Sequence, residues 1–457
     1  MYNVKSKKAT EFIDDGEVLS TIAYAKENKS NKELIRSILD KAKEYKGLSH
    51  QEAAVLLECD LEEENQEIKQ LAREIKQKIY GNRIVMFAPL YLSNYCVNGC
   101  VYCPYHHKNK NIARKKLSQE EIAREVVALQ DMGHKRLALE AGEDPVNNPI
   151  EYILESIKTI YSIKHKNGDI RRVNVNIAAT TVENYRKLKD AGIGTYILFQ
   201  ETYNKKSYEE LHPVGPKHDY AYHTEATPNC ALVSKIVVTL ADRHAEHLEA
   251  AMGVGPHTIS VPRICPAEDI KKEDFTNAIS DDIFSKIVAV TRIAVPYTGM
   301  IISTRESQKS RERVLKLGVT QISGGSSTSV GGYVEKEPED ENSAQFDLSD
   351  TRSLDEIVNW LVTLGYVPSF CTACYREGRT GDRFMSLVKS GQIANCCQPN
   401  SLITLKEYLE DYASEDTKEK GEAIIAKEFK HIDKETVRDI AWNYLKEIED
   451  GKRDFRF

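Results

Sequence analysis

The sequence has no long hydrophobic run, no excess of positive charge and no apolar segment near its first residues. No stretch approaches the roughly 18 consecutive apolar residues that a membrane-spanning helix needs. The formal net charge is −7, which is not the basic footprint of a nucleic-acid-binding protein. Residues 1–16 lack the apolar core of a secretory signal. These absences predict a cytoplasmic protein that binds neither membranes nor nucleic acid.

The ten cysteines of the 457-residue chain are unevenly distributed. In a reducing compartment, thiols are more often metal ligands or catalytic groups than disulfide partners. Six cysteines fall in two groups, at 96–103 and 371–397, and Cys396 adjoins the second group. Cys59, Cys230 and Cys265 are isolated, and we expect each to be a small buried hydrophobe. The two groups therefore indicate where function resides.

Residues 1–80 are predicted to form an N-terminal helical segment. Ser30 and Ser49 are each followed three residues later by a glutamate, which is the pattern of a capping box at a helix N-terminus. Apolar residues three to four apart follow each box, as expected for helices with one buried face. Nothing in this segment indicates chemistry, so we expect it to pack on the next domain.

From residue 81, short β-branched runs alternate with helical patterns, which is typical of a parallel sheet with crossover helices. Eight strands are predicted, so the fold class is α/β, with a TIM-type (β/α)8 barrel at 81–335 that carries its chemistry on the loops after the strands. The predicted strands are 83–87, 136–140, 172–177, 194–201, 235–240, 258–261, 300–304 and 319–323. The predicted helices are 118–132, 150–163, 181–191, 243–252, 281–293 and 308–316.

The remainder of the chain is predicted to be a mainly helical C-terminal domain at 336–457. Residues 335–350 are acidic and lack periodicity, which indicates a linker. Ser353 and Thr404 each precede a glutamate by three residues, so both are expected to begin helices.

The first cysteine group has the spacing C-x3-C-x2-C directly after the first predicted strand. Three thiols are one short of a closed four-ligand site. A 4Fe-4S cluster held by three thiolates keeps one iron open, and that iron can bind S-adenosylmethionine (SAM). The spacing, with an aromatic residue before the third cysteine, resembles the signature of the radical SAM superfamily. A structural zinc site or chance proximity of buried thiols is the alternative. The candidate ligands are Cys96, Cys100 and Cys103.

Other residues on the predicted loops after the strands are candidates for binding SAM or substrate. The ring or backbone of Tyr102 can meet adenine, although plain packing explains it equally well. Gly142 and Glu143 resemble the superfamily turn that receives the SAM amino group, with Ala141 in place of its first glycine. Glu201 is a candidate for the SAM ribose or the substrate ammonium, or else for a salt bridge on the barrel rim. The catalytic-site candidate Arg305 has a planar guanidinium suited to a substrate carboxylate, but surface arginine is the commoner case.

The second cysteine group contains Cys371 and Cys374, followed by the adjacent pair Cys396 and Cys397. Three ligands again suggest an iron–sulfur cluster with an open iron, and a zinc site that uses both neighbouring cysteines is the alternative. Adjacent thiols rarely bind one ion without backbone strain, which favours only one of the pair. The spacing from Cys374 is C-x22-C or C-x21-C, depending on which of them binds.

The two motifs together resemble those of the HydG family, the FeFe-hydrogenase maturases, which are radical SAM tyrosine lyases. The matching segments are 96–108 and 370–379, and the resemblance covers nearly the whole chain. It implies that a 5′-deoxyadenosyl radical abstracts hydrogen from tyrosine, and that Cα–Cβ cleavage then releases p-cresol and dehydroglycine. Dehydroglycine is converted to carbon monoxide and cyanide, and an iron–CO–CN–cysteine unit is passed toward H-cluster assembly.

The resemblance also implies cofactors and partners. The cofactors are two 4Fe-4S clusters, SAM, and an additional iron with a bound cysteine at the C-terminal cluster. That iron is held by a histidine of the barrel, which by position is His257, and the third ligand of the second cluster is Cys397. A neutral imidazole suits iron. Tyrosine and SAM are the implied substrates, and other maturation proteins and the FeFe-hydrogenase are the implied partners.

One segment departs from the family pattern, and two other functions remain as alternatives. Between 223–226 and 244–247 the family carries a longer insert, an amphipathic helix and a Gly-rich strand, whereas this sequence has the shorter 227–243. The first alternative is the thiamine-pathway tyrosine lyase, 2-iminoacetate synthase, which lacks the second cysteine motif. The second is a non-catalytic iron–sulfur carrier, a degenerate homologue that binds clusters but releases no p-cresol.

Overall fold

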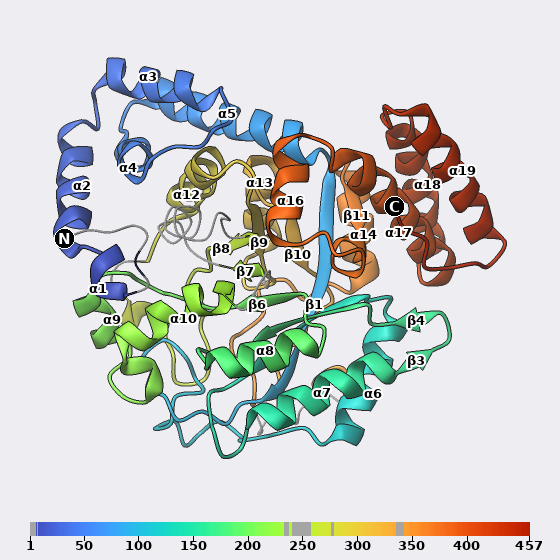
Figure 1. The fold of residues 1–457 in the computed structure, drawn as a ribbon, viewed down its shortest axis with the longest axis horizontal. Coiled ribbons are helices and arrows are strands. Elements are labelled where there is room, and N and C mark those ends of the chain that lie inside the picture. Colours follow the sequence, from blue (N-terminus) through green and yellow to red (C-terminus); the bar gives the residue numbers. More distant parts are fainter. Residues whose placement is uncertain (1–5, 7, 233–236, 240–256, 276–277, 335–341) are drawn as a thin grey trace.

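The barrel predicted from the sequence is present. The computed structural model of the 457-residue chain describes residues 6, 8–232, 237–239, 257–275, 278–334 and 342–457. Eight parallel strands follow one another around a sheet that closes because β10 pairs with β1, as Figure 1 lets the reader trace. They are β1 (Arg83–Ser93), β2 (Arg136–Ala141), β5 (Arg172–Asn176), β6 (Thr195–Ile197), β7 (Val237–Thr239), β8 (Thr258–Ser260), β9 (Gly299–Ile302) and β10 (Gln321–Ser323).

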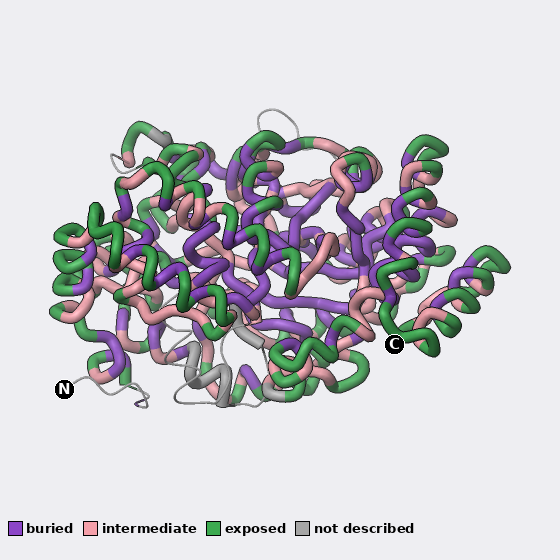
Figure 2. The backbone as a smooth tube through the Cα atoms, turned by 90° about the horizontal axis from the view of Figure 1, so that it is seen from above, coloured by how far each residue is buried: buried purple, intermediate pink, exposed green. Residues whose placement is uncertain are grey.

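Several barrel strands are buried along most of their length because a parallel barrel covers both faces of its sheet. The first four residues of β2 are buried, as are all of β10 and four of the five residues of β5. Figure 2 shows buried backbone through the centre of the molecule and exposed backbone along the outer helices. A ninth strand, β11 (Val367–Ser369), pairs with the first three residues of β1, and therefore lies at the amino ends of the barrel strands.

Five helices of the barrel lie where the periodicity predicts them. They are α6 (Gln119–Asp131), α7 (Ile150–Ser162), α8 (Val182–Asp190), α12 (Asp281–Ala294) and α13 (Gln308–Leu317). Two further helices, α9 (Lys205–Leu211) and α10 (Tyr220–Leu232), were not predicted. Smaller elements are the hairpin β3 (Lys164–His165) and β4 (Gly168–Asp169) and the 3-10 turns Pro216–His218 and Lys272–Asp274. The helix predicted at 243–252 lies outside the described residues, as do parts of the strand predicted at 235–240.

The N-terminal helices pack on the barrel as expected. They are α1 (Ala9–Phe12), α2 (Asp15–Glu27), α3 (Lys32–Ala42), α4 (His50–Glu58) and α5 (Glu62–Tyr80). The capping box of Ser49 and Glu52 is confirmed. The box predicted at Ser30 is wrong, because Asn31 caps α3 and the hydroxyl of Ser30 donates instead to Asp60, at 2.7 Å.

The C-terminal domain is helical, as predicted. It contains α14 (Leu354–Thr363), α15 (Ala373–Arg376), α16 (Gly381–Lys389), α17 (Ala394–Asp411), α18 (Glu415–Phe429) and α19 (Glu435–Glu449). The capping box of Ser353 is confirmed. Thr404 does not begin a helix, because it is buried inside α17 and its hydroxyl donates to the Asn400 carbonyl, at 2.8 Å. None of the described helices is long and apolar enough to cross a membrane.

Two buried ion pairs fasten the outer segments to the barrel. Arg171, just before β5, donates to Glu407 of α17 at 2.9 Å, and both side chains are almost fully buried. Arg311 of α13 pairs with Asp350 at 2.5 Å. Residues 342–350 therefore pack against the barrel and are not the linker that composition predicts. One apolar core contains residues from the N-terminal helices, the barrel and the C-terminal helices, so the three predicted segments pack against one another.

Candidate active site

The first cysteine group lies on a loop at the carboxyl end of β1. Two hydrogen bonds join this loop to the end of β2. The Val97 amide donates to the Glu143 carbonyl at 2.9 Å, and the Gly142 amide donates to the Ser93 carbonyl at 3.0 Å. The three thiols are therefore presented at the mouth of the barrel, where a (β/α)8 fold carries its chemistry.

Position 142 accepts only glycine. A Cβ atom there would lie 2.3 Å from the Tyr95 carbonyl oxygen and 2.9 Å from the Cβ of Cys96. The next residue, Glu143, accepts a hydrogen bond from the Asn98 side chain at 2.6 Å, and burial raises the pKa of its carboxyl. The Gly142-Glu143 turn thus packs directly against the cysteine loop.

The three thiols of the loop form one electrostatic group. Burial raises the pKa of Cys100 to about 11, and burial with repulsion from Cys100 and Cys96 raises that of Cys103 to about 12. The pKa of Cys96 is also raised by burial. Thiolates at these positions require a compensating positive charge, which an iron–sulfur core supplies. Among the described residues, no three His, Cys, Asp or Glu side chains form a group that holds a single metal ion.

A polar network lies beside the cysteine loop, and of its members the sequence motifs indicate Tyr102 and Glu201 but not His212 and Lys217. The Tyr102 hydroxyl donates to Glu201 at 2.5 Å and lies 2.9 Å from Nε2 of His212. Lys217 donates to Tyr102 at 3.1 Å and to Glu201 at 2.8 Å. Burial opposes ionisation of Glu201, but the Lys217 charge and the His212 hydrogen bond outweigh it and hold the Glu201 pKa below its usual range.

The segment that carries His212 and Lys217 supports the cysteine loop through its backbone. The amides of Gly99 and Val101 donate to the carbonyls of Val214 and Leu211, at 3.0 and 3.1 Å. The Lys217 amide donates to the Asn98 side chain at 2.9 Å. A Pro- and Gly-rich turn after a short helix was the only signal for these residues, and it carries no periodicity.

A second polar group lies near the ends of β2 and β5. Glu140 accepts a hydrogen bond from Asn176 at 2.6 Å, and burial raises its pKa to about 8. Arg305 lies after β9 and stacks on the ring of Phe346, with 3.7 Å between the guanidinium carbon and the ring centre. The positive charge of Arg305 favours the ionised form of Glu140. Arg305 thus supplies a cation, and Glu140 supplies a carboxyl with a raised pKa, on the same side of the barrel as the first cysteine loop.

The second cysteine group lies at the opposite end of the barrel. A cavity of about 110 Å³ is lined by Cys371, Cys374 and Cys397 and by the first residues of several strands, Arg83, Arg136, Arg172, Gly299 and Gln321. The Cys374 thiol donates to Cys397 and lowers the Cys397 pKa to about 6, against the effect of burial. The structure thus brings the three cysteines of the second motif together. Cys396 does not line this cavity, and its sulfur accepts from Arg379 at 3.5 Å.

His257 lines the same cavity. Its ring lies 4.5 Å from that of Phe384 and 6.1 Å from that of Tyr375, measured between ring centres. Burial, with the charges of Arg172 and Arg136, lowers the pKa of His257 to about 3, so the imidazole is neutral. Its Nδ1 is buried and has no hydrogen-bond partner among the described residues. Thiols and a neutral imidazole are ligand types that iron binds, and here they line one cavity.

The isolated cysteines behave as predicted where they are described. Cys59 and Cys265 are buried. The side chain of Cys230 lies outside the described residues.

Comparison with known proteins agrees with this arrangement. Residues 90–239 match the model of the Radical SAM superfamily, and residues 260–367 match the Biotin and Thiamin Synthesis associated domain. A crystal structure of HydG, a maturase of the [FeFe]-hydrogenase, is 53% identical, covers 98% of this chain and 100% of its own, and superposes with a TM-score of 0.94. The chain belongs to the HydG family.

Two further relatives are similar to this HydG-family chain over much of its length. HydG from Carboxydothermus hydrogenoformans is 38% identical with a TM-score of 0.81, over 94% of this chain and 98% of its own. The 2-iminoacetate synthase of Salmonella typhimurium is 28% identical over 66% of this chain and 81% of its own. Membership of a radical SAM family implies an iron–sulfur cluster and SAM as cofactors.

Proposed function

We propose that this protein is a tyrosine lyase whose second site converts the cleavage product for FeFe-hydrogenase maturation. The observation that carries the proposal is the placement of two cysteine triads at opposite ends of one barrel, in a chain of the HydG family. The products are p-cresol and dehydroglycine from tyrosine, then carbon monoxide and cyanide for an Fe(CO)(CN) unit. Other maturation proteins and the hydrogenase itself are the proposed partners.

In this proposal Cys96, Cys100 and Cys103 hold the first 4Fe-4S cluster. When bound, that cluster supplies the one electron that cleaves SAM into methionine and a 5′-deoxyadenosyl radical. The Gly142-Glu143 turn receives the SAM amino group, since it packs against the cysteine loop and carries a buried carboxyl. Tyr102 is held beside this loop by Glu201 and Lys217, so its ring has a fixed position.

The substrate is bound on the same side of the barrel. The Arg305 guanidinium stacks on Phe346 and is oriented to accept a carboxylate, as a planar fork does. Glu201 is a second candidate for binding SAM or substrate. Because its charge is already balanced by Lys217, binding of SAM ribose hydroxyls suits it better than binding of an ammonium group.

At the second site, Cys371, Cys374 and Cys397 hold a further 4Fe-4S cluster and His257 holds the additional iron. Dehydroglycine as the neutral acid has the composition of hydrogen cyanide, carbon monoxide and one water, so the conversion needs no external oxidant. Arg136 and Arg172 line the same cavity and supply positive charge toward a carboxylate that reaches it. Bound cysteine and iron are cargo here and leave with the product.

A 2-iminoacetate synthase is the second candidate, because two curated relatives carry that function. It too would release p-cresol from the first site. The cavity that gathers three cysteines and His257 favours the maturase, since that chemistry needs a second metal site. The matched region of those relatives also leaves about a third of this chain uncovered.

The two-cluster proposal is tested by electron paramagnetic resonance after anaerobic reconstitution with iron and sulfide. We expect two distinct reduced-cluster signals, only one of which changes when SAM is added. In the Cys100→Ala variant the SAM-sensitive signal should be lost and the other kept. Stoichiometric zinc without either signal would show that the thiols form structural sites.

The His257→Ala variant is expected to keep p-cresol formation and to lose the additional iron. The reason is that His257 lines the second cavity, where its Nδ1 has no hydrogen-bond partner among the described residues. This cavity is at the opposite end of the barrel from the first cysteine group. Iron content per chain and p-cresol rate measure the two effects. The matched control is His431→Ala, since His431 is exposed on the C-terminal domain. Unchanged iron occupancy in the His257 variant would refute this role.

A further inference from the structure

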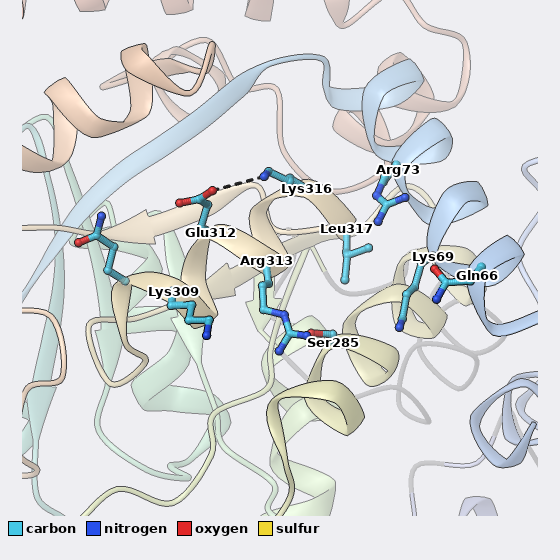
Figure 3. A pocket seen from close by; sticks show the side chains of 10 residues that line it. Gln66, Lys69, Arg73, Ser285, Lys309, Glu312, Arg313, Lys316 and Leu317 are labelled. Atoms are coloured by element: carbon cyan, nitrogen blue, oxygen red, sulfur yellow. Dashed lines mark hydrogen bonds and ion pairs between the residues drawn. The ribbon is translucent and has the colours of Figure 1, made fainter. Parts of the chain in front are cut away.

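A cleft of about 540 Å³ lies between α5 and the barrel helices α12 and α13, and neither cysteine group lines it. Five cationic side chains line it, with one carboxylate, Glu312; the cations are Lys69, Arg73, Lys309, Arg313 and Lys316. Figure 3 shows side chains from α5 and α13 around the same hollow. The whole chain has a net charge of −7, so this α5–α13 cleft is opposite in sign to the molecule that carries it.

Each of the two long helices gives the cleft one basic face. On α5 the lining residues are 66, 69 and 73, and on α13 they include 309, 313 and 316. Spacings of three and four place side chains on one face of a helix. Glu63, Glu64 and Glu67 of α5 pair with basic residues on or next to α3. The other carboxylates of this helix, Glu62 and Glu74, accept hydrogen bonds from Gln66 and Gln70 and do not line the cleft. The sorting of charge on α5 therefore concentrates cations in the cleft.

Most of these cations are not neutralised within the chain. Lys316 pairs with Glu312 at 3.3 Å, and Arg313 pairs with Asp282 at 2.6 Å. No ion pair joins Lys69, Arg73 or Lys309 to a carboxylate in the part of the chain that the structure describes. Three uncompensated cations in a concave surface attract negative charge and speed the encounter with an anionic partner.

We propose that the α5–α13 cleft docks an acidic segment of a partner protein. Lys309 and Lys316 are seven residues apart, which is about 10 Å along a helix. Cations spread over that length match successive carboxylates of a peptide better than one phosphate, which needs donors that converge on a point. The lining has no aromatic side chain on which a nucleotide base can stack.

Two short stretches of chain join the cleft to the cavity of the second cysteine group. Leu317 lines the cleft, and Thr320, three residues later, lines the second cavity. Arg73 and Tyr80 stand in the same relation on α5, seven residues or about 10 Å apart. An acidic partner held in the cleft is therefore placed beside the amino end of the barrel. The docking itself does not depend on the chemistry proposed for either cysteine site.

The proposal is tested by fluorescence anisotropy with a fluorescein-labelled poly-glutamate peptide, using the full-length reconstituted protein. We expect binding that weakens with added salt, and about a tenfold loss of affinity in the Lys69→Glu/Arg73→Glu and Lys309→Glu variants. The control is Lys427→Glu/Lys430→Glu on α18, which reverses two exposed lysines that have no ion pair in the described structure. Circular dichroism establishes that each variant is folded.

A photo-crosslinking version of the same peptide locates the contact, with crosslinks expected on α5 and α13. Equal affinity for the wild-type protein, the cleft variants and the control would overturn the proposal. So would crosslinks confined to other surfaces. Inorganic tripolyphosphate is the second probe, and tight binding of tripolyphosphate without binding of the peptide would assign the cleft to a small phosphate ligand instead. None of these measurements requires tyrosine or SAM, so their outcome is independent of the lyase activity.

Discussion

The Cys371→Ala/Cys374→Ala variant is expected to release p-cresol at the wild-type rate while its carbon monoxide output falls below detection. The two effects separate because the mutated thiols line the cavity at the amino ends of the strands, whereas tyrosine cleavage is proposed at the carboxyl ends. Gas-phase detection of carbon monoxide and chromatography of p-cresol measure both products in one reaction.

Cys396→Ala is the matched control for that experiment. Cys396 adjoins Cys397 in sequence, but it does not line the cavity, and its sulfur is engaged with Arg379. This variant should keep both products. Loss of p-cresol in the double variant, with the SAM-sensitive cluster intact, would show that the two sites do not divide the reaction.

Lys217→Met is expected to lower the free energy of unfolding by about 3 kcal/mol and to abolish most p-cresol formation. Lys217 is the cation that balances Glu201, and both side chains are largely buried. Without it the Glu201 carboxylate keeps the cost of burial and loses its ion pair. Tyr102 loses a hydrogen-bond donor at the same time, so the residue beside the cysteine loop is no longer held.

The pH dependence of this loss has a definite sign. In the wild-type protein the lowered pKa of Glu201 contributes stability that is present above the unfolded pKa and is lost as pH falls. In the variant, loss of the Lys217 charge weakens the lowering of that pKa, so less stability is gained as pH rises. The difference between the two proteins should therefore grow from about pH 3 to about pH 6 in urea denaturation. Lys205→Met, which removes an exposed lysine paired loosely with Glu209, is the control. A constant difference across that range would contradict the role assigned to Lys217.

The barrel could be predicted from the sequence because burial on both faces gives its strands an unmistakable composition. Each of the eight barrel strands overlaps a predicted strand, whereas the hairpin of β3 and β4 was not predicted. The capping pattern was less reliable. Its spacing of three also places two residues on one face inside a helix, and that is where Thr404 and Glu407 lie, on α17.

The candidate site could be predicted only where its residues fall in short local motifs. The two cysteine groups are such motifs, and the structure brings each of them together. His212 and Lys217 have no such pattern, because they become important only when a turn after α9 packs on the cysteine loop. Glu140 was missed because, within a buried strand, nothing marks the side chain that faces Asn176 and Arg305. Tertiary contacts decide these positions, and local sequence does not contain them.

The most direct measurement of the proposed function is product analysis of the reconstituted wild-type protein with SAM, dithionite and L-tyrosine. We expect p-cresol and 5′-deoxyadenosine to appear together in the complete reaction. When tyrosine or dithionite is left out, no p-cresol should form. Absence of both products, in protein whose two clusters have been verified by spectroscopy, would contradict the assignment of this chain as a tyrosine lyase.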